Sequence, residues 1–273
     1  MDYSINGYEN ENRFAEAING KKIKELNIML QNLVYSLYGV MDYDTTVNAY
    51  ISYAKHKYDL VLIIKGKRKY ISIKKGYKNS VHTEKLKTFI IFLRENNISE
   101  EVINDFLYMH YSDGTNNNSG TYRESMHCYR NKNQERIKKI NKEFENEAFI
   151  KKCIDRFFIT GVDKEATPID ALLYGSSDDF VFVLKKNIYQ IIMSQAHYKA
   201  HYIHIAQLTI QNFCRNIDRK EKNEWRREYI QVRYYDLNID IYRCLNVLNQ
   251  VQINDLSLLK PKYNENKYVI LHY

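Results

Sequence analysis

The chain has 273 residues, of which 44% are hydrophobic, so it can form one large domain or two ordinary ones around a sizeable core. Its 9 glycines and 2 prolines are too few for a fibrous or linker-rich protein. The 41 lysines and arginines exceed the 33 acidic residues by 8, a moderate surplus that suits a polyanionic partner without proving one.

The cysteines and the N-terminus bear on the cellular setting. Cys128, Cys153, Cys214 and Cys244 are far apart and form no CxxC pair, so neither a zinc knuckle nor a redox dithiol is indicated. The N-terminal stretch is polar and acidic, unlike a signal peptide, and no apolar run approaches the roughly 18 residues that span a bilayer. We therefore expect a soluble, cytoplasmic protein with no membrane partner.

The first elements in the chain read as helix, strand and strand. Residues 11–38 carry apolar side chains at helical spacing, and Asn19-Gly20 predicts a break into two helices. Residues 58–64 and 69–74 then form two β-branched runs, joined by a basic turn that contains a glycine. This pattern predicts a β-hairpin.

Residues 81–97 show helical spacing, with Phe89, Ile90 and Leu93 on one side. Ser80 precedes them and is a suitable N-cap, because its hydroxyl can accept a hydrogen bond from an unpaired amide of the first turn. The predicted order of the N-terminal region is therefore helix, strand, strand, helix.

The rest of the chain mixes helical and β-like runs. Residues 122–159 are helical in pattern and heavily charged, as is typical of a solvated helix face. A strand at 180–184 and a helix near 186–194 follow, and then two β-like runs, HYIHIAQLTIQ and YIQVRYYDL.

Together these elements predict an α/β protein with a mixed central sheet flanked by helices. We expect three regions: a core over residues 1–110, a charged helical connector over 111–165 and a C-terminal α/β part over 166–273.

Lys74 is the residue that points to a function, because apolar strands usually exclude lysine. In an antiparallel hairpin Asp59, at the start of the preceding strand, lies close to Lys74, and Glu84 follows in the first turns of the next predicted helix. Two carboxylates can hold a hard divalent cation, and a lysine can orient an attacking water and offset charge on a phosphate. This set is suited to metal-dependent phosphodiester hydrolysis.

Asp59, Ser72 and Lys74, in that order of elements, resemble the PD-(D/E)xK nuclease superfamily, which includes many restriction endonucleases. The resemblance covers about residues 10 to 95. Tyr58 stands where the motif name has proline, and Ser72 stands where it has an acidic residue. Some restriction enzymes of the superfamily carry Ser-x-Lys and draw the missing carboxylate from the following helix, so the resemblance implies that Glu84 is this migrated acid.

The resemblance also implies the roles of these residues. Asp59 and Glu84 would hold Mg²⁺ or Mn²⁺, and the Ile73 carbonyl would add a ligand. Lys74 would position the nucleophilic water, and Ser72 would hold a water at the metal.

The superfamily often has a further acid on its first helix, for which Glu16 is the candidate here. The implied activity is that of a type II restriction endonuclease. Such an enzyme would be a homodimer that cuts both strands of DNA, with a cognate methyltransferase encoded nearby.

Basic residues are the predicted DNA contacts: Lys67, Lys75, Lys78, His82, Arg215, Arg226, Arg227 and Arg233. The lysines lie near the presumed active site in the sequence. The arginines cluster around Trp225 between two β-like runs, where a two-stranded ribbon could enter the major groove. Acidic neighbours such as Glu224 leave an ion-paired surface loop as an open alternative.

Structural alternatives stand beside each of these roles. Lys74 can mark a solvated edge strand, Glu84 can be a helix-terminal acid favoured by the macrodipole, and Glu16 can be a surface residue. His82 can cap a helix. Two functional alternatives remain: a catalytically inactive nucleic-acid-binding module of the same fold, and an interaction protein with no nucleic-acid role.

A zinc site is disfavoured at His197, His201 and His204. His197 and His201 have the i, i+4 spacing of HExxH, but the glutamate of that motif is missing.

Overall fold

The computed structural model describes residues 7–53, 56–75, 80–193, 202–213, 223–235, 237 and 240–241. The chain divides into two compact units. The first unit comprises Met1–Asn79, Phe158–Ile191 and Asp236–Tyr273, and the second comprises Ser80–Phe157 and Ile192–Tyr235. The boundaries expected at residues 110 and 165 therefore fall inside the second and the first unit. The expected α/β class with a mixed sheet is confirmed.

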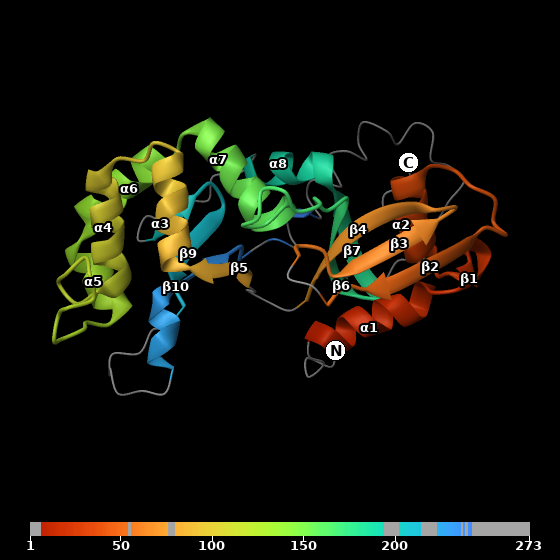
Figure 1. Cartoon of the computed structure of the whole chain (residues 1–273), viewed down its shortest axis with the longest axis horizontal. Helices are drawn as coiled ribbons and strands as arrows, with labels where there is room; N and C mark the ends of the chain where they lie inside the picture. The colour runs from red at the N-terminus through yellow and green to blue at the C-terminus, as the bar shows by residue number, and fades with distance from the viewer. Residues whose placement is uncertain are drawn as a thin grey trace. The chain divides into compact units, whose positions relative to one another are not determined.

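The first unit is built on a six-stranded mixed sheet with the order β1-β2-β3-β4-β6-β7 (Figure 1). Only the β4–β6 pair among these neighbours is parallel. The strands are β1 (Lys21–Lys22), β2 (Thr46–Ile51), β3 (Leu60–Ile64), β4 (Lys67–Lys74), β6 (Ala171–Ser176) and β7 (Asp179–Leu184).

The predicted hairpin is confirmed as β3 and β4. Lys65 and Gly66 form its turn, both with positive φ (48° and 77°), as a two-residue type I′ turn requires. The register pairs Ile64 with Lys67 at the turn and Leu60 with Ile71 toward the open end. The open end of the hairpin therefore carries the residues just before β3 and the last residues of β4.

One face of this sheet is covered by α1 (Gly7–Ile18) and α2 (Ile28–Tyr38). The predicted break between them is confirmed, with Gly20 at a φ of 75°. Asn27 caps α2 by accepting a hydrogen bond from the Leu30 amide. The buried cluster beneath the helices includes Phe14, Ile18, Leu30, Leu33, Val47, Leu60, Leu62, Ile64, Ile71, Ile73, Ala171 and Leu173.

The second unit contains a four-stranded antiparallel sheet with the order β5-β10-β9-β8. Its strands are β5 (Ser80–Lys85), β8 (Ile203–Ile205), β9 (Leu208–Asn212) and β10 (Tyr229–Arg233). Its α-helices are α3 (Leu86–Glu95), α4 (Glu100–Tyr111), α5 (Met126–Lys132), α6 (Gln134–Phe144) and α7 (Glu147–Ile154). A 3₁₀ turn, Glu224–Glu228, leads into β10.

The later strands and the helix between them follow the predicted pattern closely. A π-helical turn over Asp155–Ile159 leads the chain from the second unit back to the first, where β7 confirms the strand predicted at 180–184. The predicted helix after it is α8 (Lys185–Met193). The two late β-like runs are also confirmed, as β8, β9 and β10.

The helix predicted over residues 81–97, with Ser80 as its N-cap, is wrong in its first five residues. Ser80–Lys85 form β5, and only Leu86–Glu95 are helical. The reason is a long-range pairing: β10 aligns antiparallel with β5, with Ile230 opposite Glu84 and Val232 opposite His82. Within the described residues, no helix combines the length and the apolar composition needed to cross a membrane.

Candidate active site

Asp59 is the centre of a polar cluster at the open end of the β3–β4 hairpin. Its Oδ2 accepts hydrogen bonds from the Ser72 hydroxyl at 3.1 Å and from the Ile73 amide at 2.6 Å. The Lys74 ammonium lies 3.5 Å from the same oxygen and donates to the Ile73 carbonyl at 3.1 Å. The hairpin thus brings together the aspartate, the serine and the lysine of the Asp59–Ser-x-Lys pattern.

This cluster is anchored in the fold yet open to solvent. Ser72 is only 1% exposed, so it fixes the aspartate from the buried side. The Asp59 and Lys74 side chains are each 22% exposed, so both are partly accessible to solvent. The contacts that Asp59 receives from Ser72, Ile73 and Lys74 all fall on its Oδ2.

A second carboxylate, Glu11 of α1, is electrostatically coupled to this cluster. Burial raises the pKa of Glu11 above its usual value, the negative charge of Asp59 raises it further, and Lys74 lowers it. Glu11 precedes the buried Phe14 and Ile18 by three and seven residues, so it lies on the helix stripe that faces the sheet. Glu11 is therefore an acid of α1 whose charge is coupled to the Asp59 cluster.

Glu16, the acid expected from the first helix, is exposed. It follows Glu11 by five residues, which on a helix places it about 140° around the axis. The acid of the first helix whose pKa responds to Asp59 and Lys74 is Glu11, which was not among the predicted site residues. The i+3 and i+7 spacing to the apolar stripe was the signal that distinguishes Glu11.

The donor set fits a hard divalent cation. Asp59, Glu11 and the Ile73 carbonyl offer oxygen ligands, and the mutual repulsion of two carboxylates is what a bound cation relieves. No group of three or more His, Cys, Asp or Glu suited to a metal occurs among the described residues. Mg²⁺ commonly uses only one or two carboxylates and keeps several waters, so two acids are sufficient.

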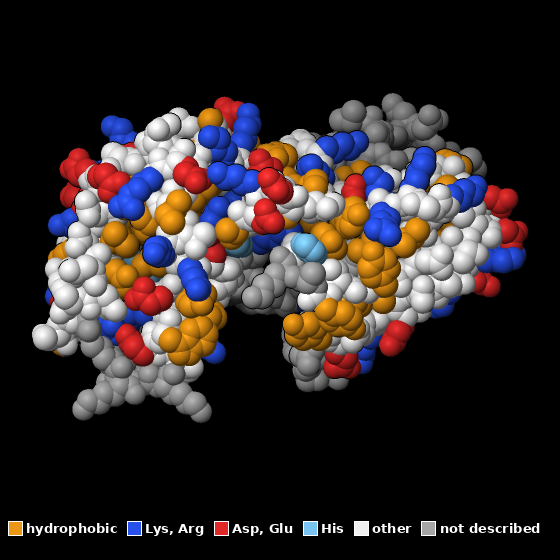
Figure 2. Space-filling model, in the orientation of Figure 1, with side chains coloured by type: hydrophobic (Ala, Val, Ile, Leu, Met, Phe, Trp, Pro, Cys, Tyr) orange, Lys and Arg blue, Asp and Glu red, His pale blue; other side chains and the backbone are white. Residues whose placement is uncertain are grey.

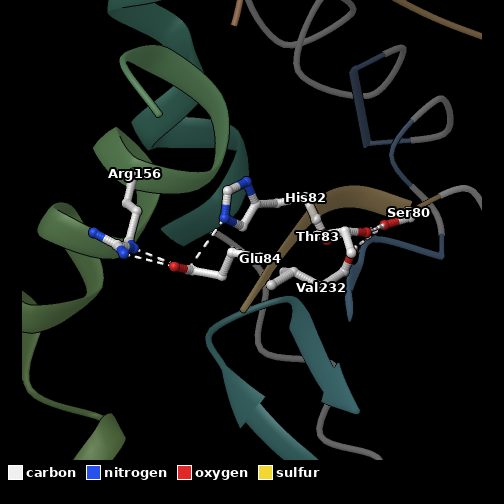
Figure 3. A network of polar contacts seen from close by, with 6 residues as sticks. All are labelled: Ser80, His82, Thr83, Glu84, Arg156 and Val232. Atoms are coloured by element: carbon white, nitrogen blue, oxygen red, sulfur yellow. Dashed lines mark hydrogen bonds and ion pairs between the residues drawn. The ribbon is translucent and has the colours of Figure 1, made fainter. Parts of the chain in front are cut away.

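Glu84 does not lie in the first turns of a helix, where it was expected (Figure 3). It lies in β5 of the second unit, where Arg156 donates to both of its oxygens at 2.9 and 2.6 Å. His82 Nε2 is 3.1 Å from Glu84 Oε1. The side chains of all three are at most 7% exposed. Burial acts to raise the pKa of Glu84, but the bonds from Arg156 and His82 outweigh it and lower the pKa overall.

These contacts make Glu84 the acceptor of a buried ion pair. Its oxygens are occupied by Arg156 and His82, and it is on a strand where a helix was expected. Glu11 is therefore a better candidate than Glu84 for the second acid that the Ser-x-Lys pattern requires. His82 is likewise buried, so the structure does not display it as a DNA contact.

The lysines predicted to contact DNA are placed differently from one another. Lys75 directly follows Lys74 and is partly exposed. Lys67 pairs with Ile64 at the turn of the hairpin, about 23 Å along β4 from Lys74, so it is not near the Asp59 cluster. Lys78 lies outside the described residues.

The arginines also differ in exposure. Arg227 is 2% exposed and donates to the Tyr111 carbonyl, so it is a structural residue and not a surface contact. Arg226 is partly exposed and lies over the Phe213 and Trp225 rings, and Arg233 donates to Gln231. Arg215 lies outside the described residues.

On the face shown in Figure 2, lysine and arginine side chains are spread over both units and interspersed with acids. His204 is 4% exposed in β8, and His197 and His201 lie outside the described residues.

No family model matches the chain, and no curated protein matches its sequence significantly.

Proposed function

We propose that this protein is a metal-dependent nuclease that hydrolyses phosphodiester bonds in DNA. The observation that carries the proposal is the cluster of Asp59, Ser72 and Lys74 at the open end of one β-hairpin, to which Glu11 of α1 is electrostatically coupled. Two partly exposed carboxylates and an ammonium group are suited to phosphoryl chemistry.

Each residue has a distinct role in this proposal. Asp59 and Glu11, with the Ile73 carbonyl, would hold Mg²⁺ or Mn²⁺, which when bound supplies Lewis-acid stabilisation of charge on the phosphate. Lys74 orients the attacking water and offsets negative charge that builds on the phosphate. Ser72 and the Ile73 amide hold the Asp59 carboxylate in place.

More specifically, we propose a type II restriction endonuclease that acts as a cytoplasmic homodimer, with a cognate methyltransferase encoded nearby. It is supported by the resemblance of Asp59, Ser72 and Lys74 to the PD-(D/E)xK pattern. The presence of Ser72 in place of an acid favours a second candidate, an inactive nucleic-acid-binding module.

Cleavage of unmethylated phage DNA with Mg²⁺ or Mn²⁺ tests the proposal. We expect wild type to cut, and Asp59→Asn, Lys74→Ala and Glu11→Gln each to lose at least 100-fold in rate, in the range measured for lost transition-state contacts. Glu16→Gln is the matched control, because it removes an exposed acid from the same helix. Discrete bands indicate sequence-specific cutting, and a smear indicates a non-specific nuclease.

Circular dichroism and thermal melts establish that the inactive variants remain folded. If folded wild type binds DNA but does not cut it with any divalent metal, the inactive binding module replaces the nuclease. If Glu16→Gln loses activity and Glu11→Gln does not, the assignment of the second acid is wrong.

A further inference from the structure

Three aromatic rings pack in series beside the Asp59 cluster, and the outer two are stacked. The His56 and Tyr58 rings are 4.8 Å apart between centroids and nearly parallel, with an interplanar angle of 16°. The Tyr58 ring in turn lies 4.7 Å from the Tyr70 ring at 51°. We call His56, Tyr58 and Tyr70 the ring stack.

The ring stack is connected directly to the proposed site. Tyr58 immediately precedes Asp59, and Tyr70 precedes Ser72 and Lys74 by two and four residues in β4. Because strand side chains alternate, Tyr70, Ser72 and Lys74 belong to the same face of the strand. The stack therefore begins on the face that carries the lysine.

The stack ends at the surface of the first unit. His56 is exposed, while Tyr58 and Tyr70 are partly exposed. Tyr50 is in line with Tyr70 across the sheet, since both pair with Val61, and it is 44% exposed. Clusters of aromatic side chains in a protein core are normally shielded from solvent. This series of rings instead runs from a strand of the sheet to an exposed imidazole.

A nearly parallel ring pair with an exposed outer member offers the next position to another planar ring. Base–aromatic stacking is worth about 1–3 kcal/mol per base, and it tolerates any base because every base has a π-face. In a duplex both faces of a base are covered by its neighbours, so a base must be unpaired or at a strand end to stack here.

We propose that the ring stack binds an unpaired nucleobase of the strand whose phosphate occupies the Asp59 cluster. The inference rests on the proposed function and deepens it, because it names single-stranded nucleic acid, or duplex with an unstacked nucleotide next to the cut, as the substrate class. His56 contacts the base, and Tyr58 and Tyr70 position His56.

Binding in EDTA tests the stack separately from cleavage. The probe is a single-stranded oligonucleotide containing 2-aminopurine, whose fluorescence is quenched by stacking, and the comparison is its blunt duplex. We expect wild type to quench the single strand and to prefer it. We expect His56→Ala to bind it about tenfold more weakly, corresponding to roughly 1.4 kcal/mol, with loss of quenching.

Two controls make the result specific. His56→Phe keeps a ring without the imidazole nitrogens, so it retains quenching if stacking is the interaction. Tyr43→Ala removes a tyrosine that is 59% exposed but lies just before β2, at the hairpin-turn end of the sheet, so its binding matches wild type. Melting curves verify that each variant is folded.

The outcomes separate this inference from the nuclease proposal. Cleavage by wild type together with unchanged oligonucleotide binding by His56→Ala overturns the ring stack and leaves the nuclease. Ring-dependent quenching without cleavage under any metal supports the stack and overturns the nuclease. Failure of wild type to bind the oligonucleotide, or preference for the duplex without quenching, overturns the stack.

Discussion

Glu11 on α1 and Asp59 before β3 lie close enough for the charge of Asp59 to raise the pKa of Glu11. The fold alone gives no reason to keep the Glu11 carboxylate, because burial and the charge of Asp59 both act against its ionised form. Retaining two repelling acids beside Lys74 is the feature expected of a site that binds a cation.

The repulsion predicts that Glu11→Gln stabilises the protein at neutral pH without metal. An acid with a raised pKa in the folded state costs stability once it ionises, so the advantage of glutamine grows as pH rises above the ordinary value of 4.5. At lower pH both states are protonated and the advantage disappears. Thermal melts in EDTA between pH 4 and pH 8 measure this, with Glu16→Gln as the control. Equal melting temperatures across the range would contradict the coupling.

Divalent metal should reverse this order of stability. A ligand that binds only the folded state stabilises it by about 2.7 kcal/mol when present at 100 times its dissociation constant. We expect Mg²⁺ or Mn²⁺ to raise the melting temperature of wild type, and to raise those of Glu11→Gln and Asp59→Asn much less. An equal rise in all three proteins would place the metal elsewhere.

The Glu84–Arg156 pair should contribute to stability and not to chemistry. Removing one partner of a buried pair leaves an uncompensated charge, so Arg156→Met should lower the free energy of unfolding by about 3–5 kcal/mol. The double variant Glu84→Met with Arg156→Met should recover most of this loss. Denaturant titration measures both. A Glu84→Met, Arg156→Met protein that is stable but unable to cleave would return Glu84 to the active site.

The same pair predicts a stability loss in acid. The pKa of Glu84 is lowered in the folded state, so its contribution is present above the ordinary value of 4.5 and is lost as pH falls through the lowered pKa. The double variant should show less of this acid dependence than wild type.

We expect a second effect of pH on stability, at higher pH than that of Glu84, from His110. Complete burial lowers its pKa from 6.5 to about 4, and its Nε2 contacts the Arg227 carbonyl at 2.6 Å. The unfolded chain binds the proton more tightly, so stability falls as pH drops from 6.5 toward 4, by about 3 kcal/mol in total. Denaturant titrations at pH 7 and pH 4 should show this loss in wild type. His110→Gln should show a smaller difference, and an equal difference would exclude His110 as its source.

The parts of the site that depend on local pattern were predictable from the sequence. Asp59, Ser72 and Lys74 come together because a turn sets the register of β3 against β4. We predicted this turn over residues 65–68, and the observed turn is the shorter Lys65-Gly66. The apolar spacing of α1 and α2 was equally visible.

The parts that depend on distant partners were not predictable. Residues Ser80–Lys85 follow a serine cap and precede helical spacing, yet pairing with β10 makes them a strand. Arg156 turns Glu84 from an apparent ligand into an ion-pair partner, and nothing in the local sequence links the two residues. Glu11 was missed because Glu11 and Glu16 are distinguished only by their angular position around the axis of α1.

Each unit is assembled from separate segments of the chain, and this order of segments has a consequence for synthesis on the ribosome. Strand β4 must wait for β6 to emerge, since Ile71 pairs with Ala171, and β5 must wait longer for β10. Throughout translation of the second unit's helices, the nascent chain therefore carries unpaired strand edges from both units. Such edges are prone to intermolecular pairing, so we expect the growing polypeptide to need chaperone protection and to refold slowly after complete denaturation.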